Sequence, residues 1–112
     1  MRELKFRVYI PDYEKFRYFT LGNFDCSDRY LHQHSYTVQQ YTGLQDKNGK
    51  DIYEGDIVRY ILGNRVYVEQ IAWENFCWVF LSFDGGSSCP IVSLPSLEVI
   101  GNITENPELK TP

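Results

Sequence analysis

Residues 40–60 have the sequence QYTGLQDKNGKDIYEGDIVRY, and this stretch decides the fold. Asn48-Gly49 predicts a tight two-residue hairpin turn, because both residue types tolerate the positive φ angles that such a turn requires. Leu44 and Ile52 flank the turn and are placed to pack across the hairpin. Gly55-Asp56 then opens a β-branched run, which is typical of a junction from a turn to a strand. The stretch therefore predicts a hairpin followed directly by a further strand.

The same signals recur toward the C-terminus. Residues 57–62 and 65–73 predict two strands joined by a Gly63-Asn64 turn, with a tight connection at Glu74-Asn75. Residues 76–83 (FCWVFLSF) are almost continuously apolar, so we expect a strand buried on both faces at the centre of the sheet. Residues 89–96, with two prolines, predict an irregular crossing or an edge strand, and residues 97–103 a last strand.

The N-terminal segment predicts a second hairpin. Residues 4–10 alternate between an apolar face and a face that carries Lys5, Arg7 and Tyr9, which is the pattern of a half-buried strand. Pro11 ends that strand, and residues 15–21 (KFRYFTL) predict its partner. The outward surface of this hairpin is expected to be cationic and aromatic.

Composition places the chain among globular proteins. Its 112 residues are enough for one domain, and the aromatic content of 16% favours strands. We predict a mostly β fold: a small SH3-like barrel or a strongly bent antiparallel sheet with an added N-terminal hairpin. The expected single domain comprises the hairpin and an irregular segment (1–42), a barrel core (43–104) and a tail (105–112).

The stretch at residues 40–60, the opening MRELKFRVYI and the ending LEVIGNITENPEL together resemble the YopX family of small phage and prophage proteins. The three blocks keep the family's order, and the resemblance spans essentially the whole chain. It implies a mostly β protein, but neither an established activity nor catalytic residues. Residues 23–35 and 75–94 carry no family pattern that we recognise, so these segments are where any activity peculiar to this chain would lie.

The outward surface of the N-terminal hairpin is the main candidate site. Its partner-binding residues are predicted to be Lys5, Arg7, Tyr9, Arg17 and Tyr18. Basic side chains among aromatic ones can hold single-stranded nucleic acid by charge and stacking, but the net charge of −4 argues against generic nucleic-acid binding. The alternatives are a solvated strand face, or a docking surface for the acidic C-terminal half of the same or a neighbouring chain.

Three other groups of residues have side chains that occur in reactive or metal-binding centres. Asp25, Cys26, Asp28, His32 and His34 are metal-competent but lack zinc-site spacing, which favours a polar surface loop. Cys77 lies in the apolar run, and Cys89 has no histidine near it in sequence. Acidic residues at turns, such as Asp51, Glu54 and Asp56, are more often capping than catalytic, and the EF-hand spacing fails at Ile57. We therefore expect no catalytic residue, no metal and no cofactor.

The sequence thus predicts a non-enzymatic phage or prophage accessory protein that binds another macromolecule, with a protein as the favoured partner. Its interface anchors are expected among whichever of Tyr9, Tyr18, Tyr41 and Tyr60 are exposed. Single-stranded nucleic-acid binding is the alternative, and an enzyme requires His32 or His34 to meet a carboxylate or thiol in a cleft. The sequence has no recognisable signal peptide and no apolar run of membrane length, and its three cysteines are an odd number without C-x-x-C spacing. We therefore expect reduced thiols and a bacterial cytoplasmic location. A homo-oligomer is compatible with the opposite charges of the two ends.

Overall fold

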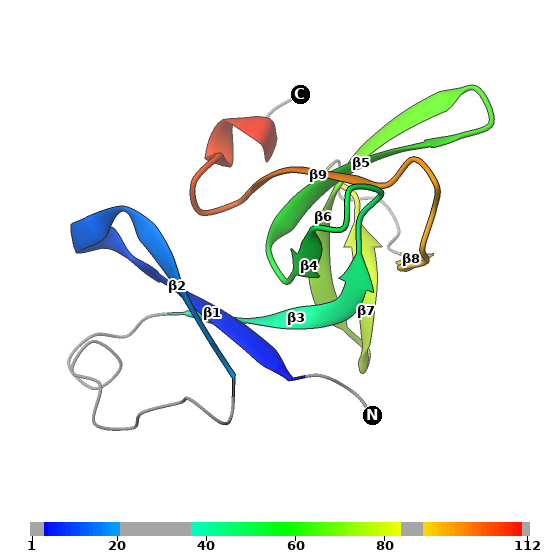
Figure 1. The fold of residues 1–112 in the computed structure, drawn as a ribbon. Coiled ribbons are helices and arrows are strands. Elements are labelled where there is room, and N and C mark those ends of the chain that lie inside the picture. Colours follow the sequence, from blue (N-terminus) through cyan, green and yellow to red (C-terminus); the bar gives the residue numbers. More distant parts are fainter. Residues whose placement is uncertain (1–3, 21–36, 84–88, 111–112) are drawn as a thin grey trace.

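The computed structural model describes residues 4–20, 37–83 and 89–110. Five strands form a curled antiparallel sheet in the order β8-β7-β6-β5-β9 (Figure 1). The bounds of these strands are β5 Asp56–Leu62, β6 Arg65–Glu74, β7 Cys77–Leu81, β8 Cys89–Pro90 and β9 Glu98–Asn102. Four further strands form a second sheet in the order β2-β1-β3-β4, with β1 Lys5–Ile10, β2 Lys15–Thr20, β3 Val38–Gln45 and β4 Asp51–Tyr53.

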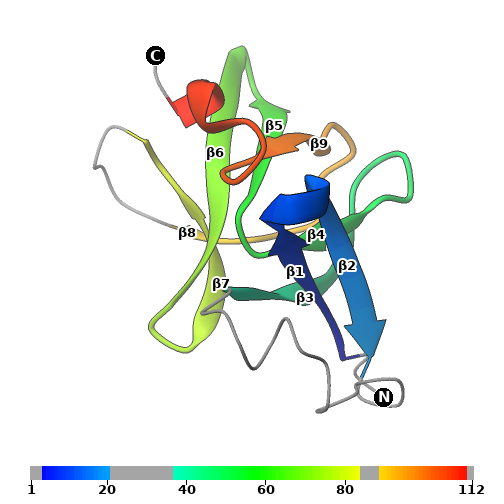
Figure 2. The same ribbon diagram turned by 90° about the vertical axis from the view of Figure 1, so that its left-hand side faces the viewer.

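The mostly β fold agrees with the prediction, in the form of a strongly bent antiparallel sheet with an added N-terminal hairpin. Figure 2 shows the β1–β2 hairpin beside the curled sheet rather than within it. The only helical segments among the described residues are two 3-10 turns, η1 Pro11–Tyr13 and η2 Pro107–Lys110. No described helix is long and apolar enough to cross a membrane.

The β3–β4 turn differs from the predicted two-residue form. The Gly49 amide donates to Asp46 O (3.0 Å) and the Asp46 amide donates to Lys50 O (2.8 Å), so three residues lie between the paired positions. Only Gly49 has a positive φ in this turn (+81°). This is a type I turn followed by a glycine bulge, and Asp46 explains it, because its carboxylate accepts from the amides of Asn48 and Lys50 (both 2.9 Å).

The β5–β6 hairpin is as predicted, with Leu62 opposite Arg65 across the two-residue Gly63-Asn64 turn. The next turn lies one residue later than predicted, at Asn75-Phe76, because Glu74 pairs with Cys77. Both turn residues have positive φ angles, 50° for Asn75 and 65° for Phe76. Phe76 lies in this turn and is 93% exposed, which contradicts its expected place in a buried strand.

The apolar run also takes a different place in the sheet. β7 lies between β6 and the short edge strand β8, and the central strand is β6. Burial on both faces is confirmed for the middle of β7, where Trp78, Val79 and Phe80 are all buried. The core combines side chains of both sheets and of the crossing before β9: Ile52, Val58, Tyr60, Ile71, Trp78, Phe80 and Leu97.

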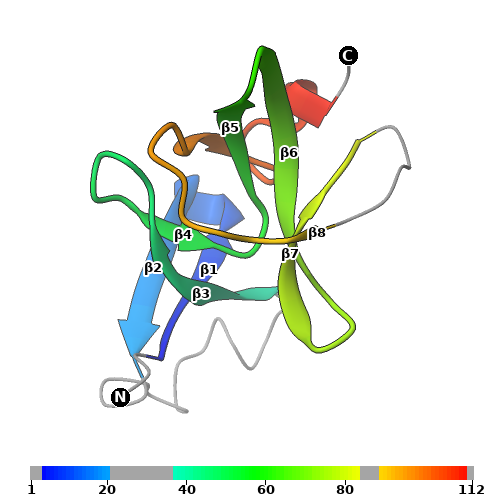
Figure 3. The same cartoon turned by 90° about the vertical axis from the view of Figure 1, so that its right-hand side faces the viewer.

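Two hydrogen bonds join the two sheets on one side of the core. The Lys47 amide donates to Leu97 O (2.8 Å), and the Val99 amide donates to Asp46 Oδ2 (3.0 Å). The β3–β4 turn therefore lies beside the segment that leads into β9 (Figure 3). Since β4 passes into β5 through Glu54-Gly55, the same hairpin that the sequence marks as decisive connects both sheets.

Candidate binding pocket on the N-terminal sheet

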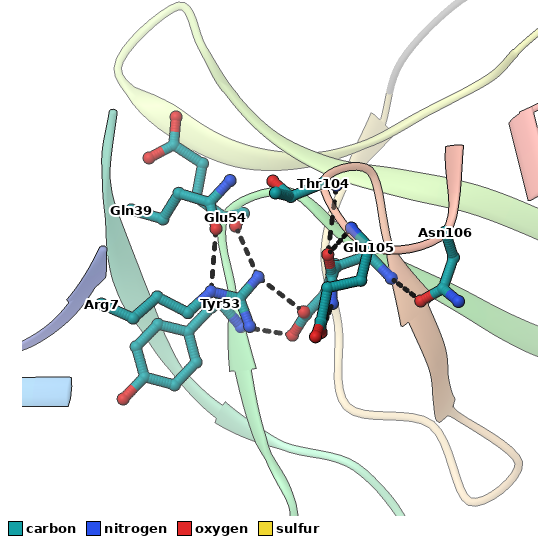
Figure 4. Close-up of polar contacts among 9 residues, drawn as sticks. Arg7, Gln39, Tyr53, Glu54, Thr104, Glu105 and Asn106 are labelled. Carbon is teal, nitrogen blue, oxygen red and sulfur yellow. Dashed lines mark hydrogen bonds and ion pairs between the residues drawn. The ribbon is translucent and has the colours of Figure 1, made fainter. Parts of the chain in front are cut away.

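Arg7, expected on the outward face of the hairpin, is buried with 4% of its surface exposed. Its Nη2 donates to Asp56 Oδ1 (2.8 Å) and to Glu54 O (3.2 Å), and its Nε donates to Gln39 Oε1 (2.8 Å) (Figure 4). The assignment of Arg7 to an exposed face was wrong because the curled sheet, through the start of β5, covers that side of β1.

Aromatic rings complete the surroundings of the Arg7 guanidinium. Its Cζ lies 4.3 Å from the centre of the Phe16 ring and 4.9 Å from the centre of the Tyr53 ring. Aromatic faces attract a desolvated cation, so both rings help to offset the cost of burial. Burial raises the pKa of Asp56, while the Arg7 charge and the Tyr53 amide, which donates to Asp56 Oδ2 (2.7 Å), oppose that rise.

A pocket of about 350 Å³ opens beside this stack. Its walls come from β1, β2, β4 and the turn before β4, and we call it the Tyr53 pocket: Lys5, Arg7, Tyr18, Lys50, Asp51 and Tyr53. Tyr18 forms its rim, with 57% of its surface exposed and its ring 5.5 Å from that of Tyr53 in an edge-on contact. Three basic side chains and one acidic side chain line the pocket, which gives it positive charge on a protein of net charge −4.

The one carboxylate of the pocket lining is already hydrogen-bonded. Lys5 Nζ donates to Asp51 Oδ2 (2.8 Å), and Gln45 Nε2 donates to Asp51 Oδ1 (3.0 Å). Partial burial alone would raise the pKa of Asp51, but the Lys5 and Gln45 contacts outweigh it and lower that pKa. Lys5 also lies over the Tyr41 ring, 4.7 Å from its centre.

Tyr53 is the most buried tyrosine of the pocket, with 5% of its surface exposed. Burial, helped by the nearby Asp51 charge, raises the pKa of its phenol to about 12. Its hydroxyl points away from the Arg7 guanidinium in Figure 4. The hydroxyl therefore stays protonated at neutral pH and can donate a hydrogen bond.

The structure brings together only some of the predicted partner-binding residues. Lys5, Arg7 and Tyr18 line one pocket, and half-buried Tyr9 packs edge-on against Phe16 (5.2 Å between ring centres). Arg17 pairs with Val8 and so lies on the opposite face of the hairpin. Of the four tyrosines proposed as anchors, Tyr18 is exposed, whereas Tyr41 and Tyr60 are buried in or beside the core.

Sequence reasoning missed Lys50 and Tyr53 as members of this site, and Gln39 and Asp56 as partners of Arg7. The contact between Arg7 and Asp56 spans 49 positions, which no local pattern reveals. Lys50 and Tyr53 lie just after the Asn48-Gly49 turn, but a hairpin alone accounts for a lysine and a tyrosine at these positions, so nothing in the sequence marks them as part of a site.

The cysteines and the metal-competent residues named in the sequence do not form a reactive centre among the residues that the structure describes. Cys77 is half-buried and its thiol donates to Glu74 O (3.4 Å), while Cys89 is exposed in the edge strand β8. No cluster of three or more metal-competent side chains occurs among residues 4–20, 37–83 and 89–110. The predicted metal candidate at residues 25–34, with both histidines, falls outside those ranges.

Comparison with known proteins decides the family. The family described as "YopX protein" matches residues 5–110 of this chain. The chain belongs to the YopX family. A solved structure with the same fold is the crystal structure of protein EF1440 from Enterococcus faecalis, which is 27% identical, with a TM-score of 0.58 over 96% of this chain and 97% of that one. A search of curated proteins found no match. Family membership confirms the resemblance carried by the central block, and it assigns no activity to the Tyr53 pocket.

Proposed function

We propose that this YopX-family chain is a non-enzymatic phage or prophage accessory protein of the bacterial cytoplasm that binds another protein. One observation carries the proposal: Tyr18 is an exposed aromatic side chain at the rim of a pocket with basic walls. Tyrosine rings beside positively charged groups are favoured anchors of protein interfaces, because they bury apolar area and still offer a polar tip.

The contacts of three aspartates near the turns of residues 46–56 support a non-enzymatic function. Asp46 holds a turn, Asp51 pairs with Lys5, and Asp56 pairs with Arg7. Each of these carboxylates is therefore occupied by contacts that stabilise the fold. A general acid or base needs a proton-transfer partner within reach of substrate, and these three are directed toward protein groups instead.

Single-stranded nucleic-acid binding is the second candidate. Lys5, Lys50 and Tyr18 share the Tyr53 pocket, which combines charge and an aromatic face as such binding requires. The burial of Arg7 and its pairing with Asp56 weaken this candidate, because they remove one of the cations that would contact phosphate.

The test is quantitative capture from host-cell lysate on immobilised protein, with nuclease-treated and untreated samples. We expect a reproducible protein partner that is retained by wild type and lost with Tyr18→Ala. Phe76→Ala is the matched control, because it also removes an exposed aromatic ring but on a different hairpin. Equal retention by Tyr18→Ala would contradict the proposal. A partner that disappears on nuclease treatment, together with salt-sensitive retention of single-stranded DNA, would favour the second candidate.

A further inference from the structure

The Tyr53 pocket contains hydrogen-bond donors that the fold leaves unused. The Tyr53 hydroxyl belongs to a side chain that is 95% buried, yet it has no hydrogen-bond partner among the described residues. Among the described residues, Trp78 Nε1 is the one side-chain N or O atom that is both buried and unpaired, so the Tyr53 oxygen is open to the pocket. The ring is held in place by burial, and its hydroxyl can donate to an acceptor that enters the pocket.

Two basic groups add to this donor set. Lys50 is exposed at the pocket and forms no ion pair with any residue that the structure describes. Arg7 uses Nε and Nη2 for its contacts, and its Nη1 donates to no described residue. Asp51 is the one acceptor side chain of the lining that carries charge, and Lys5 and Gln45 already occupy it. The pocket therefore presents donors without matching acceptors, which is the chemistry of an anion site.

We propose that the Tyr53 pocket receives the side-chain carboxylate of a glutamate or aspartate in the partner protein; this inference rests on the proposed protein-binding function. A carboxylate carries a single charge, and Lys50 supplies a single unpaired one. Asp51 lies in the same wall and repels any anion, but it repels a singly charged carboxylate less than a phosphate dianion. The edge-on pair of Tyr18 and Tyr53 offers an apolar surface for the methylene groups that precede a glutamate carboxylate.

The size of the pocket agrees with a side chain rather than a large ligand. Its volume of about 350 Å³ lies near the lower end of the roughly 300–1,000 Å³ typical of ligand sites. Tyr18 and Lys50 in its lining are both exposed, so a partner side chain can reach the pocket from solvent.

The test uses a defined probe and does not depend on finding the partner. Blocked glutamate (N-acetyl-glutamate N-methylamide) is titrated into 15N-labelled protein, and its matched control is blocked glutamine. We expect saturable shifts at the amides of Lys50, Asp51 and Tyr53 with glutamate. With glutamine the affinity should fall about tenfold, because a charge-assisted hydrogen bond is replaced by a neutral one.

Two variants remove the proposed donors without removing packing. Lys50→Met and Tyr53→Phe should each weaken glutamate binding by about three- to tenfold. Lys47→Met is the matched control: Lys47 lies in the same turn but pairs with Glu98 (3.4 Å) and does not line the pocket, so its titration should equal that of wild type. Unchanged amide spectra away from the pocket establish that each variant is folded.

The outcomes separate this inference from the function on which it rests. Equal shifts with glutamate and glutamine, or binding that survives both Lys50→Met and Tyr53→Phe, overturns the carboxylate site even where Tyr18-dependent capture of a partner succeeds. Tighter binding of inorganic phosphate or of succinate than of blocked glutamate also overturns it, since the ligand would then be a phosphate or a free acid. If glutamate binds as expected but Tyr18→Ala still captures the partner, the carboxylate site is supported and the proposal that this surface binds the partner protein is refuted.

Discussion

Arg7 Nη2 lies 2.8 Å from Asp56 Oδ1, and this ion pair joins the first strand of the N-terminal sheet to the first strand of the curled sheet. Both side chains are almost completely buried. A buried ion pair adds little net stability over an apolar pair, but breaking it leaves one charge without a partner. The pair therefore fixes how β1 docks on the start of β5.

Replacement of Arg7 tests this role. Arg7→Met keeps the bulk of the side chain but leaves Asp56 buried and unpaired, so the free energy of unfolding in urea should fall by about 3–5 kcal/mol. The control is Arg59→Met, since Arg59 is partly exposed and lies 3.9 Å from Glu98, and it should cost less than about 1 kcal/mol. Similar losses for the two variants would show that Arg7 holds no special place in the fold.

Gly55 occupies a position that no other residue can fill without rearrangement. Its φ is +86°, and a Cβ atom there would lie 2.4 Å from Gln39 Nε2, a side chain that accepts from Arg7 through its oxygen. Gly55→Ala should therefore lower the free energy of unfolding by more than Gly49→Ala, whose φ is +81° but whose Cβ would meet open space.

The difference between the two glycine variants isolates the clash from the backbone strain. Gly49→Ala should cost about 1–2 kcal/mol for the left-handed conformation alone, and Gly55→Ala at least about 1 kcal/mol more. Urea unfolding at pH 7 measures both. Equal costs would mean that Gln39 moves aside freely and that the Arg7 network tolerates its loss.

Asp46 links the decisive turn to β9, and its contribution depends on pH. Burial alone would raise the pKa of the Asp46 carboxyl. Hydrogen bonds from the amides of Val99, Lys50 and Asn48 outweigh burial and lower this pKa below its ordinary value of 3.8. Its stabilising effect is therefore complete above that value and is lost as pH falls through the lower folded-state value. Asp46→Ala should cost about 1–3 kcal/mol at pH 7 and progressively less in acid. A cost that does not change between pH 7 and about pH 2 would exclude this role for the charge.

The sequence predicts features of this fold that arise from neighbouring residues. Gly63-Asn64 is recognisable as a two-residue hairpin turn because the backbone conformation of such a turn depends on those two residues alone. The β6–β7 turn was misplaced by one residue because its second position is Phe76, a residue type that rarely takes a positive φ. The three-residue form of the β3–β4 turn depends on Asp46, whose carboxylate also reaches Val99, far along the chain.

The candidate site was predictable only in part, for a related reason. Alternation along residues 4–10 indicates which side chains share a face, but not which face another element will cover. Lys5, Arg7 and Tyr9 do share a face, and the curled sheet then buries Arg7 against Asp56. Without knowledge of that long-range contact, the positive face of the hairpin looks fully exposed.

Phe76 offers a direct test of the turn that sequence reasoning misplaced. Its φ of 65° is strained for a bulky residue, and its exposed ring gains nothing from the core. Phe76→Gly creates an Asn-Gly turn and should raise the free energy of unfolding by about 0.5–1 kcal/mol. Phe76→Ala removes the ring but keeps the Cβ atom, so its stability should stay near that of wild type. A loss of stability in Phe76→Gly would indicate that the ring makes contacts in solution.

The phenol of Tyr53 makes the free energy of unfolding fall at alkaline pH. Its phenol pKa of about 12 in the folded state exceeds the ordinary 10.0, so the unfolded chain loses this proton first. The stability that follows from the raised pKa is complete below pH 10.0 and is lost as pH rises through about 12.

Tyr53→Phe tests this dependence, because the variant has no such proton and its ring still packs against Arg7 and Tyr18. Near pH 7 the variant should match wild type within about 1 kcal/mol, because the lost hydroxyl has no described partner. From about pH 10 to 12 it should gain about 1–2 kcal/mol relative to wild type in urea unfolding. Tyr13→Phe, at an exposed ring, controls for general effects of removing a phenol, and an equal gain in that variant would refute the assignment to Tyr53.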